Sequence, residues 1–410
     1  GVAVIRISGP EAGNALRTMA GTLPEPRRAS LRSIKDSERR LLDQGLVLWF
    51  PAPNTATGED LAEMHLHGGR AVIAAVEHAL ETLHGLRRAQ PGEFTRRAFA
   101  NGRMDLAEAE GLSDLLAAET EMQRRTAMAM AGGAFSTQVE AWREQVLQLS
   151  ALVEAALDFS DEDDVSALPA SFHDQVTDFA EELKTWLFRP RADKLRDGFR
   201  VVLAGPPNAG KSTLFNALLQ DEAAITSETA GTTRDVLERP VALKGVPFLF
   251  GDTAGLRSDS DDAIEKVGID RAQQQLDLAD LVLWLGGEGE GPDGALEIDA
   301  KADAADHQPK ANPELRVSAK TGEGIVTLIN LLVERARLVL PAPGAVALND
   351  RQHMIIGDAH SALEEVGNLD DPLLVGEQLR LARLAFDRLI GRTSTEDMLD
   401  ALFGRFCIGK

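Results

Sequence analysis

The sequence is poor in cysteine, in long apolar runs and in basic charge, and each shortage excludes a class of protein. One cysteine among 410 residues excludes an intrachain disulfide framework and fits a reducing cytosol. No apolar run approaches the roughly eighteen residues that cross a bilayer, so we expect no membrane partner and a cytoplasmic protein. No internal repeat is visible. Because the chain begins at Gly1 without methionine, we expect N-terminal residues to be missing.

Acidic residues outnumber basic ones, and the formal net charge is −22 at pH 7. Nonspecific RNA binding depends on clustered lysine and arginine, so a chain this acidic must bind RNA locally or share the task with a partner. Arg87-Arg88 and Arg96-Arg97 are small basic spots for which solvation of the surface is the simpler interpretation. The acidic run 158–164 is expected to form a solvated loop.

What the sequence does contain is a glycine-flanked loop after an apolar run. Gly205-Pro206-Pro207-Asn208-Ala209-Gly210-Lys211-Ser212 follows residues 201–204 and precedes a plausible helix, which is the context of a phosphate-binding P-loop. Its N–H groups would wrap a polyphosphate, Lys211 would reach the terminal phosphates, and Ser212, followed by Thr213, would offer a hydroxyl to magnesium. A simple glycine-rich turn is the alternative. The pattern predicts a nucleoside triphosphate.

Two further segments follow in the order usual for GTPases. Asp252-Thr253-Ala254-Gly255 ends the apolar run 246–250, where an acidic residue would lie beside magnesium. Between it and the P-loop, Gly231-Thr232-Thr233-Arg234-Asp235 resembles a first switch segment, whose Thr233 hydroxyl would meet the metal when the γ-phosphate is present. A threonine-rich surface turn is the alternative for this segment.

Guanine recognition normally needs an Asn/Thr-Lys-x-Asp segment and a later Ser-Ala-Lys segment. Ser318-Ala319-Lys320 supplies the second, but the first position holds Ala300-Lys301-Ala302-Asp303, without the asparagine. Asp303 could accept hydrogen bonds from the guanine edge and Lys301 could cover the ring. The surrounding stretch 286–313 is rich in Gly, Ala and Asp, so the two residues could instead belong to a mobile loop. The departure weakens the prediction of GTP specificity.

The catalytic residues depart from the Ras-like pattern as well. Leu256 follows the DTAG segment, where Ras-like enzymes place the glutamine that orients the attacking water. An apolar residue there occurs in GTPases that are activated by G-domain dimerisation with a potassium ion acting like an arginine finger. The side-chain carbonyl of Asn208 in the P-loop could hold such a cation.

Motifs at both ends of the chain resemble the MnmE (TrmE) family of tRNA modification GTPases. The C-terminal Phe406-Cys407-Ile408-Gly409-Lys410 matches the closing C-(I/L/V)-G-K motif of the family, and the stretch 391–397 resembles the helix leading into it. At the other end, Val4-Ile5-Arg6-Ile7-Ser8-Gly9-Pro10 and the stretches 65–69, 91–99 and 101–106 resemble its N-terminal domain. Apart from the family, Cys407 could be a buried thiol near a chain end.

The resemblance implies cofactors and residues that the motifs alone do not give. It implies a tetrahydrofolate derivative, in the 5-formyl or methylene form, with Arg6, Arg103 and Lys410 as cofactor-binding residues. It assigns potassium to Asn208 and Thr226, water positioning to Glu265, and a catalytic role to Cys407. A carboxylate in the first turn of a helix is the alternative for Glu265. We interpret His65 and His67 as structural or folate-site residues and not as metal ligands.

We expect a multidomain α/β and α protein. Short strands at 2–7, 45–50 and 61–65 with a helix over 71–83 predict an α+β domain at 1–102, which the resemblance makes folate-binding and dimerising. Helical periodicity predicts a helical domain at 103–196 that resumes at 343–410. A P-loop GTPase domain of the Ras-like α/β type at 197–342 is inserted between them.

The predicted function is a GTPase that modifies the wobble uridine of certain tRNAs. The resemblance implies that a homodimer acts with an FAD-dependent, MnmG-like partner as a heterotetramer to add a (carboxymethyl)aminomethyl group. One alternative is an Era- or EngA-like regulatory GTPase in ribosome assembly, although such proteins carry basic RNA-binding domains. A second is a nucleotide sensor that binds but barely hydrolyses, which Leu256 and Ala300 would favour.

Overall fold

The structure is a computed structural model that describes residues 1–158, 168–220, 238–252, 274–305, 307–393, 396–404 and 406. Contacts divide it into two compact units. The first comprises Gly1–Ser113, Ser136–Arg143 and Phe386–Lys410, and the second comprises Asp114–Phe135 and Glu144–Ala385. None of the helices in these ranges is long and apolar enough to cross a membrane.

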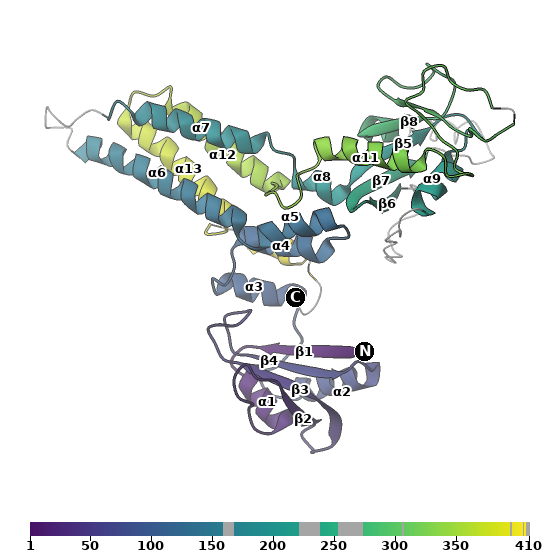
Figure 1. The fold of residues 1–410 in the computed structure, drawn as a ribbon. Helices are drawn as coiled ribbons and strands as arrows, with labels where there is room; N and C mark the ends of the chain where they lie inside the picture. Colours follow the sequence, from purple (N-terminus) through teal and green to yellow (C-terminus); the bar gives the residue numbers. More distant parts are fainter. Residues whose placement is uncertain are drawn as a thin grey trace, which may run out of the picture. The chain divides into compact units, whose positions relative to one another are not determined.

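The first unit is built on a four-stranded antiparallel sheet in the order β1-β4-β3-β2 (Figure 1). Its strands are β1 (Val2–Ser8), β2 (Ser30–Lys35), β3 (Leu41–Phe50) and β4 (Leu61–His67). Side chains of one face, such as Val47 and Met64, pack with α1 (Ala12–Ala20) and α2 (Arg70–Glu81) into one core. The three expected strands and the expected helix are confirmed, with shifted ends. Strand β2 and helix α1 were not predicted; β2 is a short edge strand with a mixed polar pattern.

Three helices of the same unit bring distant parts of the sequence together. They are α3 (Glu93–Ala100), α4 (Leu106–Ala117), which continues into the second unit, and α14 (Glu396–Phe403). The Phe99 and Phe403 rings lie 6.1 Å apart, and Arg96 pairs with Glu396 and, at 2.6 Å, with Asp400. Residues separated by about 300 positions therefore form one small core.

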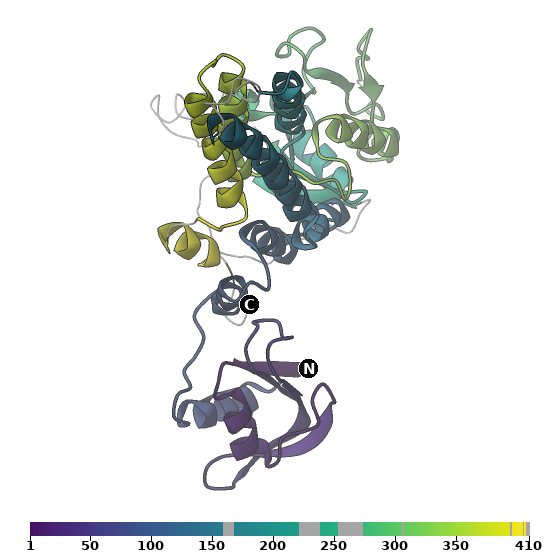
Figure 2. The same ribbon diagram turned by 90° about the vertical axis from the view of Figure 1, so that its left-hand side faces the viewer.

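The second unit contains most of a group of long helices, of which α6 (Ala134–Asp158) and α13 (Pro372–Leu389) also have residues in the first unit. In both views α6, α7 (Phe172–Leu187), α12 (Asp350–Val366) and α13 run side by side (Figures 1 and 2). Apolar residues at three- and four-residue spacing, such as Phe172, Val176 and Phe179, are buried between them because this spacing lines one face of a helix. The helical character predicted for both stretches of sequence is confirmed, with breaks between the later helices.

This unit also contains a six-stranded sheet in the order β10-β9-β8-β5-β7-β6. It contains β5 (Phe199–Ala204), β6 (Glu238–Leu243), β7 (Val246–Asp252), β8 (Leu281–Trp284), β9 (Leu296–Asp299) and β10 (Leu315–Arg316). All neighbours are parallel except the β6–β7 hairpin, whose turn residues Lys244 and Gly245 both have positive φ. Residues of α9 (Lys211–Gln220) and α11 (Ile325–Val339) share its core.

Candidate nucleotide-binding site

The predicted P-loop connects β5 to α9 at the edge of the six-stranded sheet where the parallel strands end. In the sheet, β5 lies between β7 and β8. After the P-loop the chain forms β6 and β7 on one side of β5, and after β7 it forms β8 on the other side. Such a change of direction leaves a crevice at the carboxyl ends of the strands, which is where α/β sheets bind ligands. The start of α9 adds the backbone N–H groups of a helix N-terminus and the positive end of the helix dipole to this place.

The backbone of the loop depends on glycine and on one asparagine. Gly205 has a φ of 147°, and a Cβ there would lie 3.1 Å from the backbone N of Gly286. Asn208 has a φ of 61°, a left-handed conformation that asparagine tolerates better than most residues. Lys211 is buried, and its Nζ donates to the carbonyls of Gly205 at 2.7 Å and Pro206 at 3.0 Å. The ammonium group therefore lies against the loop that would hold the phosphates.

The residues predicted to hold magnesium come from adjacent elements. Ser212 is in the first turn of α9, and Asp252 is the last residue of β7 and pairs in register with Leu203 of β5. A hydroxyl and a carboxylate are hard oxygen ligands, as Mg²⁺ prefers, and a magnesium ion bound to nucleotide needs few protein ligands. No group of three or more His, Cys, Asp or Glu residues within the described ranges could hold a metal ion by itself.

Lys301 and Asp303 are not isolated in a loop, since both have specific contacts. Lys301 Nζ donates to the carbonyl of Asn208, 93 positions earlier, so the segment after β9 is attached to the P-loop. Asp303 Oδ1 accepts a 2.6 Å hydrogen bond from the hydroxyl of Ser318, which is fully buried. That hydrogen bond, together with the nearby Lys320 ammonium, lowers the pKa of Asp303, so its carboxylate stays charged at neutral pH.

A buried carboxylate that sequence reasoning missed supports the same segment. Asp299, the last residue of β9, is 2% exposed, and its carboxylate lies 3.1 Å from His307 Nε2 and 3.0 Å from Arg316 Nε. These contacts join β9 to β10 directly beside Ala300. No local sequence pattern signals them, because the three residues come from different turns of the chain.

In the first unit, Arg6 lies on β1 opposite Glu63 of β4, and Arg6 Nε is 3.0 Å from Glu63 Oε1. Sequence reasoning did not single out Glu63, although its period-two alternation with His65 and His67 signals one face of a strand. Arg6 also lines a cavity of about 640 Å³ between β1, the end of α2 and α3. Arg103 is not among the lining residues and instead approaches Gly58.

The basic spots near this cavity are paired with carboxylates. Arg87 binds Glu93 at 2.6 Å, Arg97 binds Glu59 and Glu93 at 2.9 Å, and Arg88 binds Glu77 at 3.2 Å. The hydrogen bond from Arg87 is the largest cause that lowers the pKa of Glu93 to about 2. These arginines are therefore less available to RNA phosphates than their sequence spacing suggests.

Both histidines predicted to be structural or folate-site residues have a carboxylate partner. His65 Nε2 lies 3.2 Å from Glu63 Oε2, and His67 Nδ1 lies 2.8 Å from Asp43 Oδ1. Nine predicted residues lie outside the described part of the chain: Thr226, Thr232, Thr233, Thr253, Ala254, Gly255, Glu265, Cys407 and Lys410.

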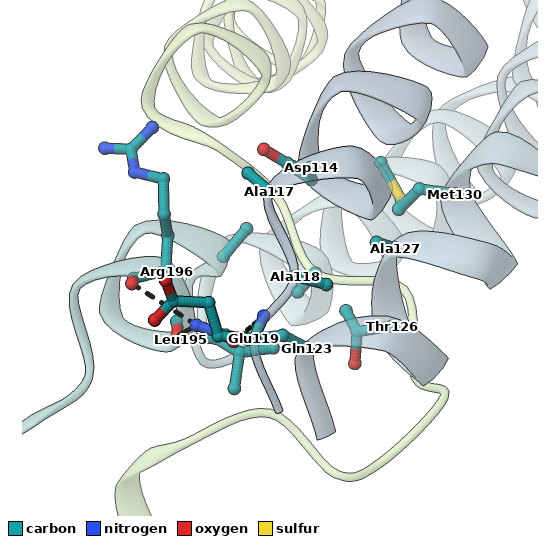
Figure 3. Close-up of a pocket in the computed structure, with 12 residues that line it drawn as sticks. Asp114, Ala117, Ala118, Glu119, Gln123, Thr126, Ala127, Met130, Leu195 and Arg196 are labelled. Carbon is teal, nitrogen blue, oxygen red and sulfur yellow. Dashed lines mark hydrogen bonds between the residues drawn. The ribbon is translucent and has the colours of Figure 1, made fainter. Parts of the chain in front are cut away.

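A further cavity, of about 270 Å³, lies where α5 (Glu121–Ala131) meets α8 (Ala192–Asp197) in the second unit (Figure 3). Gln123 Nε2 donates to the carbonyl of Leu195 at 3.0 Å, and Met122 N donates to the carbonyl of Gly245 in the β6–β7 turn at 3.2 Å. The small residues around it, such as Ala118, carried no signal in the sequence. Helix α5 is thus attached to α8 and to the β6–β7 turn, and Met122 and Leu195 share the core of the six-stranded sheet.

Comparisons with known proteins agree over the whole length of the chain. The family model described as GTP-binding protein TrmE N-terminus matches residues 1–103, and the MnmE helical domain matches residues 106–407. The tRNA modification GTPase MnmE of Erythrobacter litoralis is 62% identical over 409 residues, which is 100% of this chain and 96% of that protein. This chain belongs to the MnmE family.

Other MnmE proteins are similarly close. The tRNA modification GTPase MnmE of Novosphingobium aromaticivorans is 60% identical and that of Rhizorhabdus wittichii 56%, each over 100% of this chain and over 97% and 94% of the relative. Among solved structures, the G domain of the T. maritima FeoB iron transporter is 24% identical and covers 34% of this chain and 98% of its own. Its TM-score of 0.23 is too low to support a statement about fold or function.

Proposed function

We propose that this chain is a GTPase that acts in the modification of the wobble uridine of certain tRNAs. The observation that carries the proposal is the P-loop whose Asn208 carbonyl accepts from Lys301, in a chain that matches tRNA modification GTPases over its full length. GTP hydrolysis would change the arrangement of the helical parts, and the carbon chemistry would take place elsewhere in the protein. No relative reported above is named for ribosome assembly, so that alternative has no observation in its favour.

We assign the nucleotide site residue by residue. The loop from Gly205 to Gly210 would wrap the phosphates, Lys211 would neutralise their charge, and Lys301, Asp303 and the Ser318 segment would hold the base. Ser212, Asp252 and Thr233 would bind magnesium, which supplies a charge that stabilises the phosphate oxygens. Asn208 and Thr226 would bind potassium, and Glu265 would position the water. These roles are supported by motif spacing and by the contacts of the described members.

The N-terminal domain is proposed to bind a tetrahydrofolate derivative and to form a homodimer. The 640 Å³ cavity is of the size that holds a drug-sized ligand, and Arg6 at its edge would suit an anionic or polar group. Arg103 and Lys410 are assigned to the same ligand from the family resemblance alone. An FAD-dependent, MnmG-like protein is the proposed partner, and it would supply basic surface that this acidic chain lacks.

The test is GTP hydrolysis in potassium against the same ionic strength of sodium, with ATP as a control and with protein concentration varied. We expect a rate that is selective for potassium and that rises with protein concentration, because two G domains would have to meet around the cation. Equal rates in sodium would contradict the cation mechanism. A preference for ATP would contradict the assignment of the base site, and single-turnover hydrolysis would separate an enzyme from a nucleotide sensor.

A further inference from the structure

The cavity where α5 meets α8 lies apart from the residues assigned to nucleotide, metal and folate. Its volume is about 270 Å³, and its walls come from the end of α4, the loop before α5, α5 itself, α8 and Ala347 (Figure 3). All of these residues belong to the second unit. Ligand pockets usually begin at about 300 Å³, so this space is too small for a nucleotide. It suits a molecule about the size of one aromatic ring with a short side chain.

Most of the wall is apolar and made of small side chains. An alanine has no atoms beyond Cβ, so helices that meet through alanines leave a space that larger side chains would fill. Two larger apolar side chains, Met130 and Leu195, are buried beside it. An occupant therefore needs an apolar body. The alanines of the wall are Ala117, Ala118, Ala127, Ala192 and Ala347.

Thr126 of α5 gives this wall an unpaired hydroxyl. The residue is 4% exposed and lines the cavity, and its Oγ1 has no hydrogen-bond partner within the described part of the chain. Most buried hydroxyls are paired, because leaving one unpaired costs free energy. A molecule bound in the cavity could supply the missing partner, since a hydroxyl both donates and accepts.

The amide of Gln123 is already used within the wall. Its Nε2 donates to the carbonyl of Leu195 at 3.0 Å, and its Oε1 accepts from the backbone N–H groups of Glu119 at 3.0 Å and Thr120 at 2.9 Å. Gln123 therefore holds the wall together and is not the group that would select a ligand.

The charged side chains of the lining favour a cation. Two of them, Asp114 and Glu119, are carboxylates, and one, Arg196, is a guanidinium. Arg196 has acidic neighbours of its own outside the lining, Asp193 at 3.3 Å and Asp197 at 3.5 Å. A carboxylate has about four acceptor positions, so Asp114 and Glu119 can accept from a ligand while they keep other contacts.

We propose that the cavity between α5 and α8 binds a small organic ammonium ion. Its apolar body lies against the alanines, and its charged nitrogen donates to Asp114, Glu119 and the Thr126 hydroxyl. An anionic ligand of the same size would face two carboxylates and is rejected. Because α5 is also attached to the β6–β7 turn, the occupant stabilises the part of the unit that carries the P-loop. Binding of the amine does not depend on the proposed GTPase function.

The test uses three probes of nearly the same shape, benzylamine, benzyl alcohol and benzoate, which are a cation, a neutral molecule and an anion at neutral pH. Each is titrated into the full chain at low ionic strength, with binding followed by ligand-observed NMR. We expect benzylamine to bind with a dissociation constant on the order of 1 mM. Benzyl alcohol should bind at least about fivefold more weakly, and benzoate should show no saturable binding.

Two variants locate the bound amine. Ala118→Leu fills the cavity and should weaken benzylamine by at least about tenfold, whereas Ala155→Leu, at an exposed position of α6, should leave it unchanged. Thr126→Val keeps the shape but removes the hydroxyl, and should weaken benzylamine by about three- to tenfold. Its control is Thr177→Val on α7, whose hydroxyl donates to the carbonyl of His173. Thermal unfolding checks that each variant folds; if Ala118→Leu does not, Thr126→Val and the three probes decide.

Three results would overturn the inference. Equal affinities for benzylamine and benzyl alcohol would show that the site does not select a cation. Benzylamine that binds Ala118→Leu and Thr126→Val as tightly as the unchanged chain would lie somewhere else. If benzylamine shows no saturable binding to the unchanged chain, the cavity does not take this class of ligand.

Discussion

Asn208 combines two requirements that few residues meet. Its φ of 61° favours glycine or asparagine, and its proposed role as potassium ligand needs a side-chain carbonyl. Its backbone carbonyl also accepts from Lys301, so a change of conformation at this position would affect the base site. A glycine at this position keeps the left-handed backbone and its carbonyl but removes the side-chain carbonyl. Mutation to glycine can therefore test the side chain apart from the backbone.

Asn208→Gly should retain nucleotide affinity and lose the stimulation of hydrolysis by potassium. Asn208→Ala should lose the stimulation and also weaken nucleotide binding by a few-fold, since alanine at positive φ costs on the order of 1 kcal/mol. Nucleotide titration and hydrolysis rates in potassium and sodium measure the two effects. Potassium stimulation that survives in the glycine variant would rule out the side chain as the ligand.

Glu93 gives a prediction about pH. Its folded pKa of about 2, lowered chiefly by the hydrogen bond from Arg87, lies below the ordinary value of 4.5. The ionised form is favoured in the folded state, so its stabilising contribution is complete above pH 4.5 and is lost as the pH falls toward 2. Lowering the pH from 5.5 to 3 should reduce the melting temperature of the wild-type protein more than that of Glu93→Gln. Equal losses would show that the pair contributes nothing to stability.

Helix α5 is held to two neighbouring elements of the second unit, α8 and the β6–β7 turn. Thr120 and Gln123 form a capping box at its start, and the same Gln123 donates to the end of α8. One side chain thus closes a helix N-terminus and holds a neighbouring helix. Because Gln123 has both roles, its mutation should lower stability more than mutation of a surface glutamine. In the sequence, a glutamine three residues after Thr120 would by itself suggest only a helix cap.

Gln123→Ala should lower the free energy of unfolding by about 1–2 kcal/mol, from the lost cap interaction and the lost hydrogen bond to α8. Gln148→Ala is the control, since this exposed glutamine of α6 donates a 3.3 Å hydrogen bond to Glu144 on its own helix, and its loss should change stability by less than about 0.5 kcal/mol. Chemical denaturation of both variants gives the comparison. Indistinguishable midpoints would show that the α5–α8 contact is not stabilising.

At the scale of the whole molecule, the nucleotide site is the proposed switch and the C-terminal motif is the proposed chemical centre. The nucleotide site lies in the second unit, whereas Cys407 belongs to the C-terminal motif that follows α14 of the first unit. If GTP hydrolysis only drives a change of conformation, removing the Cys407 thiol should not change the rate of hydrolysis.

Cys407→Ser should abolish tRNA modification and leave GTP hydrolysis within about twofold of wild type. Modification of tRNA by the complex with its FAD-dependent partner and hydrolysis by the same preparation are the two measurements. Cys407→Ala serves as the control, because it tests whether the loss follows from the missing thiol or from the new hydroxyl. Loss of both activities would indicate a structural role for this position.

The sequence by itself determined the P-loop. The loop would bind phosphates through consecutive backbone N–H groups and one lysine, and residues that are consecutive in the chain form a pattern that the sequence shows directly. Hydrophobic periodicity likewise predicted the long helices and three strands of the first sheet. The limits of the four predicted domains and the roles of the site residues remain predictions.

Only the tertiary structure decided how distant residues meet. Lys301 lies 93 positions from Asn208, and Arg96 lies about 300 positions from its partners on α14. It also showed that the arginine spots are neutralised by carboxylates from other elements and that Asp303 is held by the buried Ser318. A hydrogen bond forms between two groups that are close in space. A chain of this length could bring many different pairs of donors and acceptors together, so the sequence pattern does not show which of these pairs form.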